Sequence, residues 1–163
     1  MIATNLFRIE PIPAAALRRI RAAGRDDIGN PLRLSVADRP GAPLRCCLRE
    51  AQPGERLALI AWQPFENGGP YAEVGPVFVH AEECAGYTEV HAYPDGYRHR
   101  KQVFRPYDAS GDMVYEAIEV VEGAGAEAAI ARIFARTEVA VIHSRNLLAG
   151  CWMFSIHRDT PAA

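Results

Sequence analysis

The sequence predicts an α+β fold, a single domain spanning residues 1–163 in which a mostly antiparallel sheet is packed by two helices. Most apolar runs are short, as strands are, and are separated by turns drawn from 12 prolines and 13 glycines. Short turns between strands imply antiparallel pairing. Helical periodicity appears in two places far apart in the chain, residues 13–24 and 126–136, as expected for helices packed on a sheet. A chain of 163 residues is long enough to bury one core.

The first half of the chain begins with a strand at Leu6–Ile9 and a helix that opens at Pro13 and ends at Gly24. Proline costs no hydrogen bond at the first helical position, and glycine suits the residue that follows a helix. Leu17 and Ile20 give this helix one apolar stripe. The elements predicted next are strands at Leu32–Val36, Leu57–Trp62 and Pro76–His80, a turn at Gln52–Glu55 and a loop at Glu66–Pro70.

The second half of the chain predicts a hairpin, a helix and two closing strands. Pro94-Asp95-Gly96 is a strong turn signal between two runs that alternate in polarity. The elements predicted here are hairpin strands at Glu89–Tyr93 and Tyr97–Arg105, a turn at Ala109–Asp112, a strand at Val114–Val121, a helix at Ala126–Arg136, and strands at Val139–His143 and Cys151–His157.

Composition and charge exclude several classes of partner. The net charge of −2 and the pI near 6.2 give no general attraction for nucleic acid or an anionic membrane. No apolar run approaches the roughly 18 residues of a membrane span, and the N-terminus lacks the pattern of a secretory signal. The adjacent pair Cys46 and Cys47 suits no disulfide framework. We therefore expect a cytoplasmic protein with reduced thiols, and neither nucleic acid nor membrane as its partner.

The stretch Val120–Ala128 contains Gly123-Ala-Gly125 and lies between a predicted strand and a predicted helix. This arrangement is typical of dinucleotide-binding proteins, in which glycines let a pyrophosphate approach a helix. Glu122 and Glu127, however, would place negative charge beside the phosphates, and too little chain follows to complete such a fold. We interpret the glycines as a tight turn and expect no nucleotide cofactor.

The basic stretch Tyr97–Tyr107 interleaves five cationic or histidine side chains with three aromatic ones. Such mixtures bind single-stranded nucleic acid in some proteins, but the overall charge argues against that here. A charged edge strand that resists self-pairing is the simpler interpretation. A contact with an anionic ligand or a protein partner remains the alternative.

His80 ends a predicted central strand, and Cys84 follows four residues later. A zinc site needs about four ligands, and Cys46 and Cys47 should point in opposite directions, so we expect no metal and disfavour zinc. A thiol nucleophile, Cys47 or Cys84 with His80 or His143 as its base, is a second interpretation. A buried thiol beside a core histidine is the third.

The loop that follows the strand at residues 139–143 contains His143, Arg145 and Asn146. An arginine fork binds carboxylates and phosphates with two parallel hydrogen bonds, and Arg45 offers a second cation. These residues predict an anion-binding site at strand ends, with a hairpin loop as the alternative.

Four segments of the chain are distinctive as a set. They are residues 24–31, Arg45–Leu48 with Pro53–Glu55, Glu73–Ala81 with Cys84, and His143–Asn146 with Gly150 and Cys151. In this order they resemble a bacterial family known only as domain of unknown function number 1203. The resemblance runs from about Phe7 to Arg158 and implies a small, one-domain bacterial protein with no assigned activity.

The chain departs from that family at one position. Members often show Cys-x-x-Cys-Leu where this chain has Leu44-Arg-Cys-Cys47-Leu. Cys47 matches the second cysteine, and Leu44 replaces the first. The resemblance therefore implies that any metal or redox function of that pair is lost here, unless Cys46 substitutes.

The leading hypothesis is a small-molecule site, binding or enzymatic, for an anionic ligand. Its residues are Arg45, Cys47, His80, Cys84, His143, Arg145 and Asn146, with the arginines and Asn146 holding the ligand and the cysteines and histidines as catalytic candidates. The rival hypothesis is a protein interaction module without chemistry, a homodimer for instance. Its surface would be the basic hairpin with Tyr93, Tyr97 and Tyr107 exposed.

Overall fold

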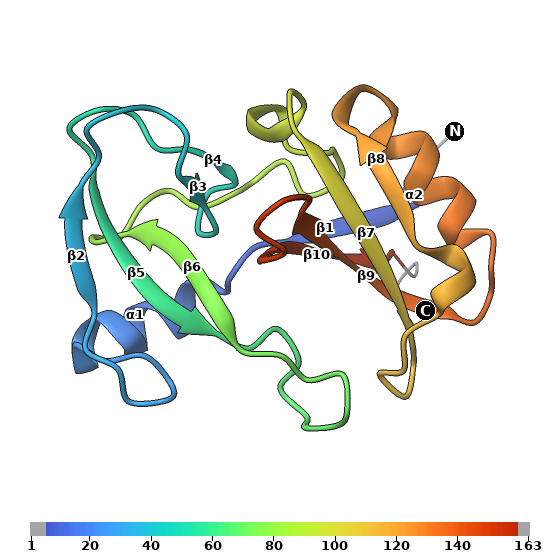
Figure 1. Ribbon diagram of the computed structural model, residues 1–163, viewed down its shortest axis with the longest axis horizontal. Helices are drawn as coiled ribbons and strands as arrows, with labels where there is room; N and C mark the ends of the chain where they lie inside the picture. The colour runs from blue at the N-terminus through green and yellow to red at the C-terminus, as the bar shows by residue number, and fades with distance from the viewer. Residues whose placement is uncertain (1–5, 160–163) are drawn as a thin grey trace.

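The computed structural model describes residues 6–159 and contains two five-stranded sheets and two α-helices (Figure 1). The first sheet has the order β2 (Arg33–Val36), β5 (Arg56–Trp62), β6 (Gly75–His80), β3 (Pro43–Leu44) and β4 (Arg49–Glu50). The second has the order β1 (Phe7–Glu10), β10 (Trp152–Arg158), β9 (Val139–Asn146), β7 (Lys101–Asp108) and β8 (Glu119–Glu122). Only β3 and β6 pair in parallel among these strands. The predicted α+β class with mostly antiparallel pairing is confirmed, although the strands divide between two sheets.

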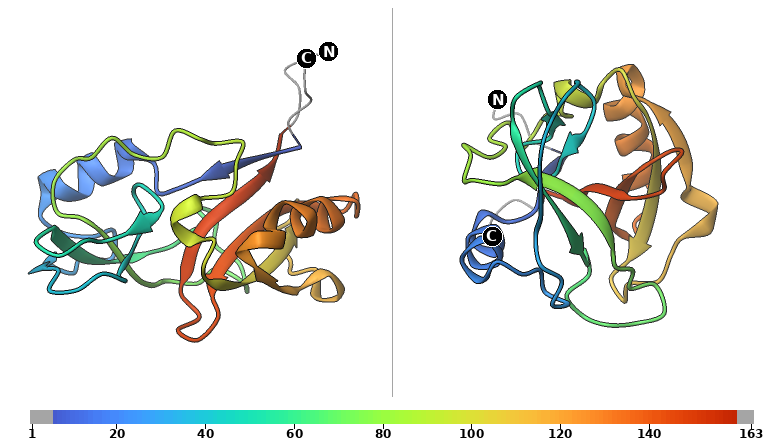
Figure 2. Two further views of the ribbon diagram at one scale, coloured as in Figure 1. Left: turned by 90° about the horizontal axis from the view of Figure 1, so that it is seen from above. Right: turned by 60° about the vertical axis from the view of Figure 1, so that its left-hand side comes forward.

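The two predicted helices are confirmed. Helix α1 (Ala14–Ala23) follows Pro13 and ends at Gly24, whose φ of 65° is the left-handed conformation that glycine adopts without strain. Its apolar stripe, Leu17 and Ile20, is buried. Helix α1 lies beside the first sheet (Figures 1 and 2), and the Arg21 guanidinium donates a hydrogen bond of 2.9 Å to the carbonyl of His80 at the end of β6.

Helix α2 (Ala126–Phe134) covers one face of the second sheet (Figure 1). Ile130 and Phe134 of the helix share one apolar core with Phe104 of β7 and Ile142 of β9. Because side chains alternate along a strand, Arg105 of β7 and the neighbouring residues 143 and 145 of β9 lie on the opposite face.

The hairpin predicted around Pro94 is wrong. Residues 89–93 form no strand, Asp95–Tyr97 form a 3-10 turn, and β7 begins only at Lys101. A Cβ at Gly96 would stand 2.8 Å from the Cα of Arg49, so this turn packs against the first sheet. The hairpin does not form because Tyr93 and Tyr97 are buried in the core instead. The Tyr97 hydroxyl donates a hydrogen bond to the carbonyl of Leu44.

The predicted strand at Val114–Val121 is only half correct, since a 3-10 turn at Tyr115–Ala117 precedes β8. Strand β1 pairs with β10, Phe7 opposite Arg158, so the two ends of the described chain lie side by side (Figure 2). Within residues 6–159, no helix is both long enough and apolar enough to cross a membrane.

Candidate metal centre

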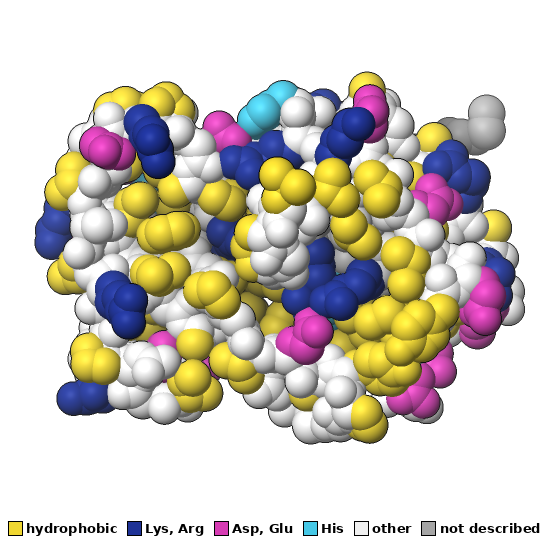
Figure 3. Space-filling model, in the orientation of Figure 1, with side chains coloured by type: hydrophobic (Ala, Val, Ile, Leu, Met, Phe, Trp, Pro, Cys, Tyr) yellow, Lys and Arg dark blue, Asp and Glu magenta, His cyan; other side chains and the backbone are white. Residues whose placement is uncertain are grey.

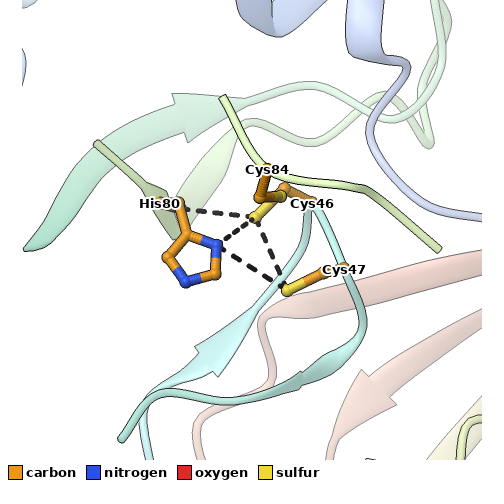
Figure 4. Close-up of side chains that lie close together, drawn as sticks. All are labelled: Cys46, Cys47, His80 and Cys84. Atoms are coloured by element: carbon orange, nitrogen blue, oxygen red, sulfur yellow. Dashed lines mark hydrogen bonds between the residues drawn. The ribbon is translucent and has the colours of Figure 1, made fainter. Parts of the chain in front are cut away.

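Three cysteines and one histidine converge beside the first sheet. They are Cys46, Cys47, His80 and Cys84, and their ligand atoms all lie within 4.8 Å of one another (Figure 4). The two adjacent cysteines come from the turn between β3 and β4, His80 ends β6, and Cys84 lies four residues further on. Sequence analysis had placed three of these residues in one candidate site and had not counted Cys46 among them.

The turn after β3 explains how adjacent cysteines reach the same cluster. The amide of Leu48 donates to the carbonyl of Leu44 at 3.0 Å, and Leu48 has a φ of 56°, in the left-handed region. Adjacent side chains point to opposite sides only in an extended strand, and this tight turn brings both sulfurs to one side. The expectation that zinc is disfavoured was therefore wrong, because its main argument assumed extended backbone at residues 46 and 47.

The spacing of the donor atoms matches a tetrahedral zinc site. The Nδ1 atom of His80 lies 3.5 Å from the sulfur of Cys46 and 3.8 Å from that of Cys47, and the two sulfurs are 3.9 Å apart. Zinc–sulfur bonds near 2.3 Å and zinc–nitrogen bonds near 2.0 Å give a tetrahedron with edges of roughly 3.5–3.8 Å. An ion at the centre of the cluster would thus have bonds of ordinary length to these three residues.

A carboxylate sets the orientation of the histidine ring. The Nε2 atom of His80 lies 3.1 Å from Oε1 of Glu55 and 3.4 Å from a nitrogen of Arg49. The carboxylate is the closer partner and can only accept, so Nε2 donates to it, while Nδ1 faces the sulfurs of Cys46 and Cys47. Metal-binding histidines typically make this second contact to a carboxylate.

Glu55 is itself held firmly. Arg49 binds its carboxylate with two hydrogen bonds, of 2.9 and 2.5 Å, and the amide of Gln52 donates to it at 2.6 Å. The bonds from Arg49 hold the pKa of Glu55 far below its usual range. In the sequence, Gln52–Glu55 was predicted as a turn, and Pro53–Glu55 belonged to the segments that carry the family resemblance, but Glu55 was given no role at the site. No local pattern distinguishes a turn carboxylate that faces a distant histidine.

The three thiols differ in acidity. The hydrogen bond between the two neighbours raises the pKa of Cys46, with burial adding to the effect, and lowers the pKa of Cys47. Burial raises the pKa of Cys84. The sulfur of Cys46 also accepts a hydrogen bond of 3.3 Å from the amide of His80. Amide donors favour the thiolate form that binds metal.

The cluster borders a cavity of about 430 Å³. Cys46 and Cys84 form part of its wall, together with Leu17 and Arg21 of α1 and Tyr87 of the connection to β7. Cys46 is only 4% exposed, whereas Cys47 and Cys84 are partly exposed.

The remaining predicted site residues lie elsewhere. Arg45 is fully buried, and its guanidinium donates to the carbonyls of Trp152 and Pro43 and to the sulfur of Cys151. Asn146 accepts hydrogen bonds from the amides of Leu148 and Ala149 and so caps the β9–β10 turn. Both side chains are occupied by the fold. His143 and Arg145 lie on β9 of the second sheet.

The aromatic residues expected on an exposed hairpin are buried. Tyr93, Tyr97 and Tyr107 are each at most 1% exposed. The basic residues between them form ion pairs, Arg98 with Asp95 and Glu127, and Arg100 with Glu50. The expectation of an aromatic interaction surface here was wrong, because all three rings are packed inside the fold. Tyr93 and Tyr97 pack against Phe154 of β10, with ring centroids 5.7 and 6.2 Å away, whereas Tyr107 packs against Phe65 and His143 on the other face of the sheet.

Comparison with known proteins identifies a family for this chain. The model of a family described as a protein of unknown function (DUF1203) matches residues 41–158. No curated protein matches, and no solved structure matches. The matched region contains all four residues of the metal cluster and begins later than the resemblance near Phe7 suggested. Because it covers well over half of the 163 residues, the chain belongs to the DUF1203 family.

Proposed function

We propose that the protein binds one zinc ion through Cys46, Cys47, Cys84 and His80. The observation that carries this proposal is the set of three distances, 3.5, 3.8 and 3.9 Å, between donor atoms. These distances are within about 0.3 Å of the edges of a zinc tetrahedron. The fourth ligand, Cys84, lies within the same 4.8 Å cluster. A zinc ion bound there would link the β3–β4 turn, the end of β6 and the segment that contains Cys84.

The chemistry of the donors favours zinc over harder cations. Thiolates are soft ligands that select zinc or copper(I) over magnesium and calcium, and sites with mixed sulfur and nitrogen ligands in tetrahedral array are typical of zinc. Four protein ligands complete the coordination, which is the pattern of structural zinc sites, whereas catalytic sites keep one position for water. We therefore assign the ion a structural or regulatory role.

Metal titration tests the proposal. The reduced, chelator-treated protein should bind one equivalent of Zn²⁺ in calorimetry, and Co²⁺ in its place should give the absorption bands of tetrahedral cobalt with thiolate ligands. Cys84→Ser and His80→Gln should weaken binding strongly, and Glu55→Gln by about 10–100-fold because it orients the histidine.

Cys151→Ser is the matched control, since this fourth cysteine lies against Arg45 and outside the cluster. It should bind zinc like the unmodified protein. Equal zinc affinity in Cys84→Ser, His80→Gln and the parent chain would show that these residues are not the ligands and would refute the proposal.

A thiol nucleophile at Cys47 is the second candidate function. The lowered pKa of Cys47 and its distance of 3.8 Å from His80 Nδ1 support it. Iodoacetamide separates the two candidates, because bound zinc should suppress alkylation of Cys47. Alkylation of Cys47 at an unchanged rate in the presence of saturating zinc would favour the nucleophile.

We further propose a bacterial origin and a cytoplasmic location. All four cysteines are free thiols, which suits a reducing compartment. Localisation of a tagged chain in a bacterial host would check the second point.

A further inference from the structure

A second group of charged side chains lies on the face of the second sheet that α2 does not cover. In the register of β7 and β9, Arg105 is opposite His143, and Val103 is opposite Arg145. Arg105 and Arg145 are therefore diagonal neighbours on one face. Figure 3 shows basic side chains gathered near the centre of one side of the molecule, beside a hollow between the two sheets.

The loop between β5 and β6, residues 63–74, covers this polar face. The centroid of the Phe65 ring lies 4.5 Å from that of His143 and 4.9 Å from that of Tyr107. The ring centroids of Tyr71 and Tyr107 are 6.3 Å apart. Near the end of the loop, Glu73 forms ion pairs with both Arg105 and Arg145 through the same oxygen, Oε2. One loop carboxylate thus lies between two guanidinium groups.

The charges of this group do not balance. Two arginines face one carboxylate. Burial lowers the pKa of Arg145, and the positive charge of the neighbouring Arg105 lowers it further. Arg145 is only 8% exposed. Among residues 6–159, the Nε atoms of both arginines and the hydroxyl of Tyr107 are buried without a hydrogen-bond partner. Buried donors without acceptors are costly and are rare in folded proteins.

A cavity of about 400 Å³ lies directly beside the two guanidinium groups. Its walls include Arg105, Arg145 and Glu73 on the charged side, and Trp62 and Trp152 on the apolar side. The centroids of the two indole rings are 6.4 Å apart. A volume of this size holds a small molecule, and such sites combine apolar walls with a few convergent polar groups.

We propose that this cavity binds a small organic carboxylate, whose carboxylate group pairs with Arg105 and Arg145 and whose apolar body lies against Trp62 and Trp152. Planar guanidinium groups match a carboxylate in geometry as well as in charge. Glu73 occupies the carboxylate position in the ligand-free protein and acts as an internal competitor. Its side chain is 48% exposed, so it moves into solvent when the ligand enters.

Tryptophan fluorescence gives a direct readout, because Trp62 and Trp152 are the two tryptophans of the chain and both line the cavity. The probe is phenylacetate, with benzyl alcohol as its uncharged counterpart and inorganic phosphate as an anion without an apolar body. Phenylacetate should change the emission in a saturable manner that weakens with added salt. Benzyl alcohol and phosphate should not saturate over the same range.

Variants assign the binding to these residues. Arg105→Gln and Arg145→Gln should each weaken phenylacetate binding about tenfold or more, as expected when a charged hydrogen-bonding partner is lost. Glu73→Gln should strengthen binding by about tenfold, because the competing carboxylate is removed. Arg105 is the more exposed of the two arginines, 22% against 10% for its side chain, so Arg105→Gln keeps the test valid if Arg145→Gln does not fold.

The pair Arg132 and Glu119 offers matched controls, because it forms an exposed ion pair on α2 and β8. Arg132→Gln and Glu119→Gln carry the same charge changes and should leave the affinity unchanged. The proposal is overturned if phenylacetate saturates neither the parent protein nor Glu73→Gln. It is also overturned if Arg105→Gln binds phenylacetate as tightly as the parent does. Saturation by phosphate alone would also overturn it, because the apolar walls would then contribute nothing.

Discussion

At the scale of single residues, His143 illustrates how burial changes the chemistry expected from a sequence. A histidine at a strand end was a candidate base, but its ring packs against both Phe65 and Tyr107, which also contact each other. Its Nδ1 atom is buried without a hydrogen-bond partner among the described residues. Burial, with the nearby positive charges of Arg145 and Arg105, lowers the pKa of His143 to about 3. The side chain is therefore neutral at physiological pH.

This lowered pKa predicts a pH dependence of stability. Below about pH 6.5 the unfolded chain binds a proton at His143, whereas the folded chain does not until about pH 3, so stability falls as the pH falls through this window. Between pH 7 and pH 5 the contribution of His143 should decline by about 2 kcal/mol. Urea unfolding at both pH values measures it.

His143→Gln should remove this part of the pH dependence, whatever its effect on absolute stability. His99→Gln is the control, because His99 is exposed and experiences no comparable burial. If the difference in unfolding free energy between pH 7 and pH 5 is the same in His143→Gln and the parent, the burial explanation is wrong.

At the scale of elements, the two glycines of the Gly123-Ala-Gly125 turn have different roles. A Cβ at Gly123 would lie 2.2 Å from the backbone oxygen of Arg98, whereas a Cβ at Gly125 would meet nothing within 4 Å. The Arg98 side chain also donates to the carbonyl of Gly123 and binds Glu127. The turn that resembles a phosphate-binding loop is therefore a packing contact between β8, α2 and the connection to β7.

Substitution of the two glycines should separate these roles. Gly123→Ala should destabilise the fold by about 3 kcal/mol, since backbone must move to accommodate the methyl group. Gly125→Ala should change stability by less than about 1 kcal/mol, because the poorer helix cap and the lower entropy of the unfolded chain oppose each other. Equal urea midpoints for the two variants would contradict the packing role of Gly123.

At the scale of the whole molecule, the cluster of Cys46, Cys47, His80 and Cys84 lies where the first sheet joins the long connection, residues 81–100, that leads to the second sheet. The cluster unites the β3–β4 turn, the end of β6 and this connection. The connection in turn buries Tyr93 and Tyr97 against Phe154 of β10. An ion bound at Cys84 would thus hold the segment that links the two sheets.

Zinc should therefore stabilise the whole fold. At a free zinc concentration about 100 times the dissociation constant, a ligand that binds only the folded state contributes about 2.7 kcal/mol, which corresponds to a rise in Tm of roughly 5–10 °C for a chain of this size. Thermal unfolding with zinc and with chelator measures the difference. Cys84→Ser should show little of this rise, while Cys151→Ser should show all of it.

The local elements could be predicted from short stretches of the amino-acid sequence. Helix α1, helix α2 and strands β5, β6 and β10 were predicted close to their observed bounds, because periodicity, proline and glycine act over a few residues. Strand β9 runs through Asn146, so the loop predicted at residues 143–146 was wrong. The sequence also identified Cys47, His80 and Cys84 as neighbours in one candidate site. These three residues lie at turns or close to the end of a strand, in short segments bounded by turn-forming residues. Their positions could therefore be recognised without knowledge of the rest of the fold.

The nature of that site and the division into two sheets depend instead on contacts between segments that are distant in sequence. Cys46 joins the cluster because a left-handed residue at Leu48 tightens its turn, and Glu55 reaches His80 across 25 residues of sequence. Arg105 and Arg145 meet at Glu73 through strand register and a covering loop. Tyr93 and Tyr97 are core residues because their segment packs against Phe154 of the distant strand β10. Contacts between distant segments depend on how complete elements pack, and no local pattern of residues encodes that packing.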